Sequence, residues 1–165
     1  MYGFEKYGDF TKLFRPSPSR ANPVIGESVP TPPLVGCTQT FITFTCQSEE
    51  ECINVDKYIN TKFCKALLSI LKVTQHNPPR TWANVPLQDF SNNSDIDWSG
   101  SLAEIDKQLY RKYDLDNNTI EFIESHFCYH PRFDEKAAFI KKYGVNDFYK
   151  HYKAELAARK EGENV

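Results

Sequence analysis

The sequence predicts an α+β fold, a small sheet with a packed helix, followed by C-terminal helices. Residues Cys37 to Cys46 are mostly β-branched or aromatic, which is typical of a strand on a pleated, half-buried surface. After this strand, apolar residues recur about every four positions, which is the period of an amphipathic helix. At 165 residues with 40% hydrophobic side chains, the chain is long enough for one domain, alone or with a helical appendage.

The first two segments of the chain differ in composition. Residues 1–14 form an N-terminal arm rich in aromatic side chains: Tyr2, Phe4, Tyr7, Phe10 and Phe14. Disordered tails are poor in aromatic residues, so we expect this arm to dock on the chain's own core or on another chain. Residues 15–36 hold six prolines, which exclude a helix and a central strand. We therefore expect an extended connector or a long surface loop there.

A long helical pattern follows the strand. Ser48 and Glu51 have the spacing of a capping box at a helix N-terminus. The apolar positions of the helical stripe are Val55, Ile59, Phe63, Leu67 and Leu71, with Ile70 widening it. We expect Asn60-Thr61 to divide this run into two helices and Asn77-Pro78-Pro79 to end it.

The next stretch predicts a second strand and a loop. Trp82 to Phe90 has the composition of a strand, which Pro86 restricts to a sheet edge or a bulge. Residues 91–100 are polar and contain two aspartates, so they predict a surface loop.

Helices are predicted for the remainder of the chain. Ser101 and Glu104 form a second capping-box pattern, and the helix that begins there is expected to reach Tyr113. A further helix is expected from about residue 119 to residue 126. Two amphipathic helices are predicted at 133–143 and 147–160, with Gly144 as the C-cap between them.

Charge and cysteine content restrict the function classes. A net charge of -2 argues against a protein that coats nucleic acid non-specifically, although it leaves room for a local basic patch. No apolar run approaches the roughly 20 residues that span a membrane, and the N-terminus lacks a signal-peptide pattern. We therefore expect a cytoplasmic protein without membrane contact. Five irregularly spaced cysteines predict buried reduced thiols rather than a disulfide framework.

Four short motifs follow one another along the middle of the chain. They are Thr61-Lys62-Phe63, Thr74-Gln75-His76, Val85-Pro86-Leu87-Gln88-Asp89-Phe90 and Leu109-Tyr110-Arg111-Lys112-Tyr113. In this order they resemble the C-terminal target-recognition portion of type II restriction-modification adenine methyltransferases, large enzymes that methylate adenine and often carry a nuclease. The resemblance covers about residues 35 to 127. It predicts a target-recognition-like α+β domain at 37–127 and a helical C-terminal extension at 128–165.

This resemblance implies a DNA target-recognition module that is not catalytic by itself. Its partners would be double-stranded DNA and a methyltransferase or nuclease domain or subunit. The chain has no glycine-rich loop after a strand, so we expect S-adenosylmethionine to bind in a partner domain. Asn77-Pro78-Pro79 matches part of a methyltransferase catalytic tetrapeptide, but Arg80 replaces the aromatic residue that stacks on the flipped base. We interpret this stretch as a helix stop. The proline-rich segment and the tail beyond about residue 129 depart from the family pattern.

The candidate DNA-contacting residues lie on one helix and in the loop that ends it. They are Lys62, Lys65, Lys72, Thr74, Gln75, His76, Asn77 and Arg80. The three lysines have a spacing that puts them on one helix face, where ammonium groups can contact phosphates. The amide and guanidinium side chains of the loop have the donors and acceptors that read base edges in a major groove. The alternative interpretation is a solvated helix face followed by a polar loop.

Two other clusters suggest chemistry less strongly. His126, Cys128 and His130 alternate like metal ligands, but zinc needs about four ligands and no second pair is evident. We expect a helix end with partly exposed histidines. Asp89, Asp95 and Asp97 would support a metal-dependent nuclease only if they converged, and the lysine that accompanies such sites is missing.

A protein-interaction module is the alternative function. The near-neutral charge, the aromatic arm and the amphipathic C-terminal helices suit a chain that docks on a methyltransferase or nuclease subunit, or a remnant with little DNA affinity. A continuous positive patch on Lys62, Lys65, Lys72 and Arg80 would favour DNA recognition. An apolar groove near the N-terminal arm would favour a protein partner.

Overall fold

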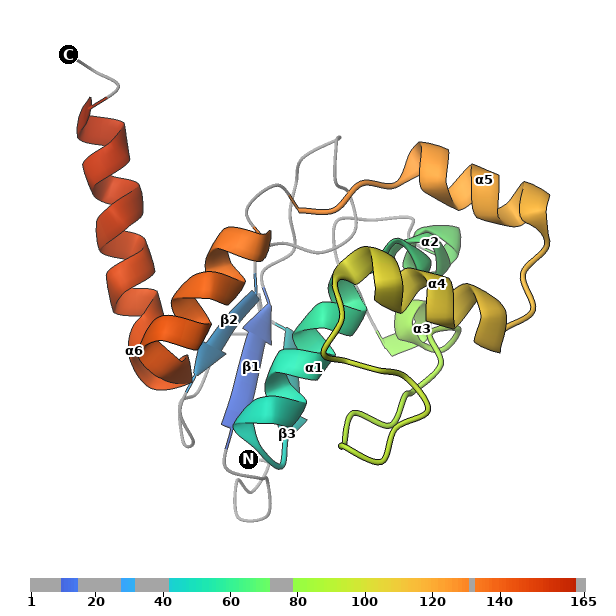
Figure 1. The fold of residues 1–165 in the computed structure, drawn as a ribbon, viewed down its shortest axis with the longest axis horizontal. Helices are drawn as coiled ribbons and strands as arrows, with labels where there is room; N and C mark the ends of the chain where they lie inside the picture. The colour runs from blue at the N-terminus through green and yellow to red at the C-terminus, as the bar shows by residue number, and fades with distance from the viewer. Residues whose placement is uncertain (1–9, 15–27, 32–41, 72–78, 131–132, 163–165) are drawn as a thin grey trace.

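The computed structural model describes residues 10–14, 28–31, 42–71, 79–130 and 133–162 (Figure 1). Within these ranges the fold is α+β, as predicted, with one three-stranded sheet and six helices. The strands are β1 (Phe10–Phe14), β2 (Ser28–Thr31) and β3 (Ile42–Cys46). The helices are α1 (Glu49–Asn60), α2 (Lys62–Leu71), α3 (Pro79–Trp82), α4 (Leu102–Lys112), α5 (Asn117–His126) and α6 (Phe133–Gly162).

The sheet is antiparallel, and its strand order is β2-β1-β3. Thr11 of the central strand pairs with Thr31 on one side and with Thr45 on the other. Pro30 lies in β2, at the sheet edge, where the missing amide hydrogen of proline is tolerated. β1 belongs to the predicted arm and β2 to the predicted connector, so one sheet joins their described residues to the predicted recognition domain.

Helix α1 packs against β1 and β3, and Thr61 separates it from α2, as predicted. The extended backbone of Thr61 (φ -62, ψ 152) ends α1, and its hydroxyl accepts a hydrogen bond from the Cys64 amide at 3.2 Å. The carboxylate of Asp106 on α4 accepts hydrogen bonds from the first two amides of α2, those of Lys62 at 3.0 Å and Phe63 at 2.9 Å. The N-terminus of α2 is thus capped by a side chain from another helix.

The predicted helix starts at Ser48 and Ser101 are confirmed, but the two caps differ. Ser101 and Glu104 form a complete capping box at the start of α4. At α1, Ser48 accepts the Glu51 amide at 3.1 Å, whereas the Glu51 carboxylate accepts the amide of Gln47. The second half of that box therefore reaches one residue further back than a capping box requires.

The segment from Trp82 to Phe90 is not a strand, so this prediction is wrong. Its first residue ends α3, and the remaining residues follow an irregular path. Side chains of α1, rather than a neighbouring strand, bind the backbone of this segment. Asn54 Nδ2 donates to the Phe90 carbonyl at 2.9 Å, and the Tyr58 hydroxyl donates to the Pro86 carbonyl at 2.7 Å. Pro86 has no amide hydrogen for a ladder, and β1 and β2 complete the sheet instead.

The main core lies between α1, α2, α4 and the irregular segment. The predicted stripe is buried at Val55, Ile59 and Phe63, but Ile70 is 68% exposed and does not widen it. Leu68, two positions earlier on α2, is fully buried instead. The side chain of Leu71 lies outside the described residues.

The cysteines are mostly as predicted. Cys46, Cys52 and Cys64 are buried and are not joined in disulfides, and burial raises the pKa of Cys64. Cys128 is also outside any disulfide, and it is exposed in the connection after α5. Cys37 lies outside the described residues.

Helix α6 has two halves, as predicted from Gly144, whose positive φ of 73° interrupts the helix. A buried ion pair fastens its first half to the domain: Lys136 Nζ lies 2.7 Å from Asp56 Oδ2 of α1. The same ammonium donates to the Ser28 hydroxyl of β2 at 2.5 Å. None of the helices in the described ranges combines the length and the apolar character needed to cross a membrane.

Candidate nucleic-acid interface

Lys65 lies on the face of α2 that packs against the segment after α5. Its side chain is buried, with 1% of the residue exposed, and its ammonium donates to the Cys128 carbonyl at 2.8 Å. Burial lowers the pKa of Lys65, and nearby acidic groups such as Asp106 oppose this effect. The prediction that Lys65 contacts phosphate is therefore wrong, because no phosphate reaches a buried ammonium.

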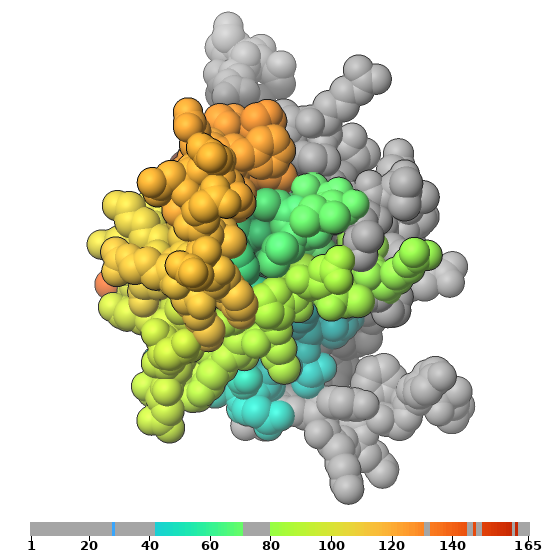
Figure 2. All heavy atoms as spheres, turned by 90° about the vertical axis from the view of Figure 1, so that its right-hand side faces the viewer, coloured from blue at the N-terminus to red at the C-terminus, as the bar shows by residue number. Residues whose placement is uncertain are grey.

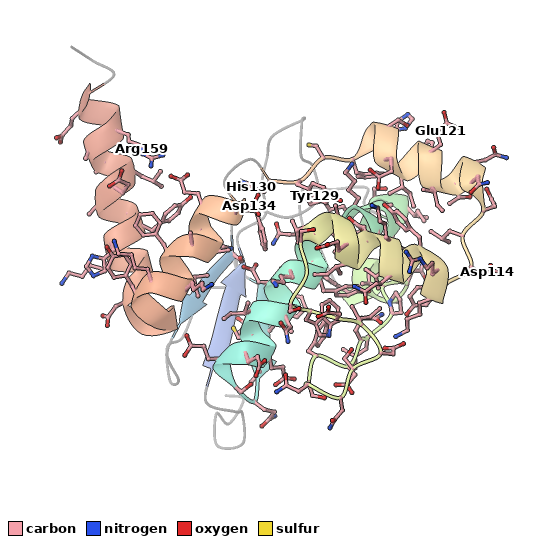
Figure 3. All side chains as sticks on the ribbon, in the orientation of Figure 1. Asp114, Glu121, Tyr129, His130, Asp134 and Arg159 are labelled. Atoms are coloured by element: carbon pink, nitrogen blue, oxygen red, sulfur yellow. The ribbon has the colours of Figure 1, made fainter. Side chains whose placement is uncertain are left out.

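Lys62 is also engaged within the protein. Its ammonium lies 2.5 Å from a carboxylate oxygen of Glu124 on α5 and 4.9 Å from the centre of the Tyr129 ring. Figure 3 places Tyr129 in the connection between α5 and α6. The side chain of Lys62 is 13% exposed, so a phosphate would have to displace Glu124 to bind it. The two lysines thus fasten α2 to α5 and the segment after it.

The other predicted contacts lie in or next to the loop after α2. Lys72, Thr74, Gln75, His76 and Asn77 are outside the described residues. Arg80 is exposed on α3, where solvent reaches its guanidinium group. In Figure 2 the chain that follows Arg80 (light green) crosses the visible face between α2 (green) and the start of the β3 region (cyan). Among the candidate DNA contacts that the structure describes, Arg80 is therefore the one that is fully accessible to DNA.

Asp106 organises a buried polar network beneath α2. Besides the two α2 amides, it accepts a hydrogen bond from the Tyr129 hydroxyl at 2.9 Å. Burial raises the pKa of Asp106, and the hydrogen bonds from the Phe63 and Lys62 amides and from Tyr129 oppose this rise. These contacts join α4 to α2 and to the connection after α5, so we interpret the network as a structural link between these parts rather than as a reactive centre.

Three of the four motifs that carry the family resemblance meet in one place. The rings of Phe63 and Tyr113 stack with centroids 5.0 Å apart and planes inclined by 19°. The buried Gln88 amide donates to the Tyr113 hydroxyl at 2.8 Å and accepts from the Lys112 ammonium at 2.9 Å. We call Phe63, Gln88 and Tyr113 the motif junction. Sequence reasoning missed this contact; a glutamine between the apolar residues of its motif was the available signal.

An apolar groove of about 270 Å³ lies beside the motif junction, lined by parts of β3, α1, α3 and the irregular segment. On its wall, the rings of Phe44 and Trp82 meet edge to face with centroids 5.0 Å apart. Trp82 Nε1 is buried without a hydrogen-bond acceptor in the described structure. Leu87, which also lines the groove, is 91% exposed. One strand that lines this groove, β3, pairs with β1, which is the described part of the N-terminal arm.

The three aspartates considered for a nuclease serve local turns and an ion pair. The Ser91 amide donates to Asp89 at 2.8 Å and lowers its pKa; hydrogen bonds from the Ser99 hydroxyl and amide do the same for Asp97. Asp95 pairs with Lys112 at 2.7 Å. In the part of the chain that the structure describes, no three His, Cys, Asp or Glu side chains gather as metal ligands. The convergence that a metal-dependent nuclease requires is therefore not found there.

The histidine and cysteine cluster also has a structural arrangement. The His126 ring stacks on Phe122 with centroids 4.2 Å apart, and its Nδ1 lies 2.9 Å from the Phe122 carbonyl. His126 and Cys128 are exposed and His130 is partly buried, which fits the predicted helix end. These contacts stabilise the last turn of α5 and need no metal ion.

No protein-family model matches the chain, and comparisons with curated proteins and with solved structures give no match.

Proposed function

We propose that this chain is a DNA target-recognition module of a restriction-modification adenine methyltransferase system and is not catalytic by itself. The contact between motifs at the motif junction supports this proposal most directly. Phe63 and Tyr113 lie in motifs about fifty residues apart, and their rings stack. Aromatic residues of one hydrophobic core pack together in any small domain. The contact therefore supports the proposal only by placing these motifs in one folded scaffold, as a recognition domain would require.

In this proposal, the scaffold and the DNA contacts are different residues. Lys62 and Lys65 hold α2 in place, and the following loop and α3 contact DNA. The contacting residues would be Lys72, Thr74, Gln75, His76, Asn77 and Arg80. An exposed arginine suits this role because its guanidinium group donates two parallel hydrogen bonds to guanine or to a phosphate. S-adenosylmethionine and the catalytic loop would come from a partner domain or subunit.

Selection from a pool of random duplex DNA, at low and at physiological salt, tests this function. We expect the bound fraction to be enriched in a short adenine-containing sequence. The triple variant Gln75→Ala/Asn77→Ala/Arg80→Ala should lose this enrichment, because each change removes donors that read base edges. The matched control Asn92→Ala/Asn93→Ala/Arg111→Ala removes similar groups from exposed positions elsewhere and should keep the enrichment.

The apolar groove favours a second candidate, a protein-interaction module. Here the groove would bind an apolar segment of a methyltransferase or nuclease subunit, with Leu87 in the contact, since exposed apolar surface of this kind marks protein interfaces. The two candidates give opposite results in the pool selection. No retention of DNA even at low salt would contradict the recognition module and leave the docking module.

A further inference from the structure

Helix α3 has only four residues, and it carries Arg80 beside two side chains that face the domain. Arg80 is exposed, whereas Thr81 is 2% exposed and Trp82 is partly buried. A helix this short has little stability of its own, because starting a helix fixes several residues for a single hydrogen bond. The place of α3 on the domain therefore depends on contacts with other elements, and the place of Arg80 depends on the same contacts.

Trp82 joins α3 to the sheet. Its ring meets the ring of Phe44 on β3 edge to face, with centroids 5.0 Å apart and planes inclined by 71°. Both rings pack against the main core and line the apolar groove. Trp82 Nε1 makes no hydrogen bond in the described structure, so the ring holds α3 through its shape and not through its polar atom. Another aromatic side chain at this position could therefore do the same.

The backbone links the Trp82 ring to Arg80 over a short distance. The Ala83 amide donates to the Arg80 carbonyl at 3.3 Å, and the Val85 amide donates to the Trp82 carbonyl at 3.0 Å. These two turns overlap along residues 80–85. Because Arg80 and Trp82 lie in one helical turn, a shift of the Trp82 ring moves the backbone that carries the guanidinium group.

We propose that Trp82 is a positioning residue for Arg80: its ring, packed on Phe44, fixes the direction from which the Arg80 guanidinium group meets DNA. This inference rests on the proposed DNA-recognition function and deepens it. A guanidinium group that donates two parallel hydrogen bonds requires a defined geometry, so displacement of α3 weakens the contact. Trp82 does not touch DNA itself, and its effect on affinity passes through Arg80. The two residues are therefore energetically coupled.

A double-mutant cycle measures this coupling. Affinity of the full chain for the duplex that the pool selection enriches is measured by fluorescence anisotropy for wild type, Arg80→Ala, Trp82→Leu and the double variant. We expect Arg80→Ala to weaken binding about tenfold, the loss for one bidentate contact. Trp82→Leu should weaken binding by up to the same factor. Adding Trp82→Leu to Arg80→Ala should weaken binding by less than about twofold further, whereas independent effects would multiply.

Two controls separate positioning from general loss of stability. Trp82→Phe keeps an aromatic ring against Phe44 and should bind DNA more tightly than Trp82→Leu does. Phe139→Leu removes a comparable edge-to-face contact from α6, with Tyr152 at 5.6 Å, and should bind DNA as wild type does. Circular dichroism at the assay temperature checks that each variant is folded. If Trp82→Leu does not fold, Phe44→Leu takes its place in the cycle, because it breaks the same ring contact from β3.

The outcomes distinguish this inference from the proposed function. A multiplied loss in the double variant overturns the positioning role, because Trp82 would then act independently of Arg80. Unchanged affinity of Trp82→Leu, an equal loss in Phe139→Leu, or Trp82→Phe binding no better than Trp82→Leu also overturns it. So does unchanged affinity of Arg80→Ala, because there would be no contact to position. In all these cases DNA recognition stands if the wild-type chain enriches a sequence. A wild-type chain that does not bind DNA at low salt overturns the proposed function itself.

Discussion

Asp106 is a buried carboxylate that caps a helix to which it does not belong. The change Asp106→Asn replaces one acceptor oxygen by an amide group, which faces the donors on Lys62, Phe63 and Tyr129. We expect this variant to lower the free energy of unfolding by about 2–4 kcal/mol, because a buried hydrogen-bond network loses its charged acceptor. Urea unfolding followed by circular dichroism measures the change.

The control for Asp106→Asn is Glu124→Gln, which weakens the ion pair with Lys62. Because Glu124 is 43% exposed, we expect this change to cost under about 1 kcal/mol. Equal unfolding midpoints for Asp106→Asn and wild type would rule out the capping role that the geometry assigns to Asp106.

At the scale of single residues, periodicity predicted apolar burial better than polar burial. Val55, Ile59 and Phe63 are buried as their spacing predicts, because residues four positions apart lie on one helix face, and an apolar face packs on the core. Lys65 was expected in solvent, but its burial depends on the Cys128 carbonyl, which is 63 positions away in sequence. A distant acceptor leaves no trace in local spacing. The predicted phosphate contact at Lys65 failed for this reason.

At the scale of elements, the start of α4 depends on a cap whose acid is sensitive to pH. Hydrogen bonds from the Ser101 amide and hydroxyl lower the pKa of Glu104 below its ordinary value of 4.5. A lowered folded-state pKa means that the ionised carboxylate stabilises the fold above about pH 4.5, and that this stabilisation disappears as pH falls through the folded value. Melting temperature should therefore fall less steeply for Glu104→Gln than for wild type between about pH 5 and pH 3.

The hydroxyl half of the same cap is tested at constant pH. Ser101→Ala removes the acceptor for the Glu104 amide and should cost about 1 kcal/mol of stability at neutral pH. Superimposable pH profiles for Glu104→Gln and wild type, together with an unchanged midpoint for Ser101→Ala, would contradict the importance of the cap.

The helix starts and the strand β3 were predictable from this sequence, but β1, β2 and the pairing of the strands were not, for a physical reason. The starts of α1 and α4 are set by hydrogen bonds between residues three or four apart, so Ser48 and Ser101 mark them locally. Strand pairing joins residues that are distant in sequence, so local composition does not reveal it. The segment from Trp82 to Phe90 has the composition of a strand, but in the described structure it does not pair with a neighbouring strand. β2 contains Pro30 and is still a strand, because at a sheet edge its missing amide costs little.

At the scale of the whole molecule, one buried ion pair joins three distant parts of the chain. Lys136 of α6 contacts Asp56 of α1 and the Ser28 hydroxyl of β2, and the same hydroxyl donates to Asp56. Lys136→Met should lower the free energy of unfolding by about 3–5 kcal/mol, because it leaves the Asp56 carboxylate buried without its counter-charge. The matched control Lys141→Met, on an exposed position of the same helix, should change stability by less than about 0.5 kcal/mol.

The double variant Lys136→Met/Asp56→Asn separates charge pairing from simple packing. It removes both charges, and asparagine keeps an oxygen that can accept the Ser28 hydroxyl hydrogen bond. If Lys136→Met loses stability because the buried Asp56 carboxylate has lost its counter-charge, the double variant should recover roughly half or more of the lost free energy of unfolding. A double variant as unstable as Lys136→Met would instead show that α6 is held by the packing of the lysine stem, and the attachment of the C-terminal extension would not depend on charge.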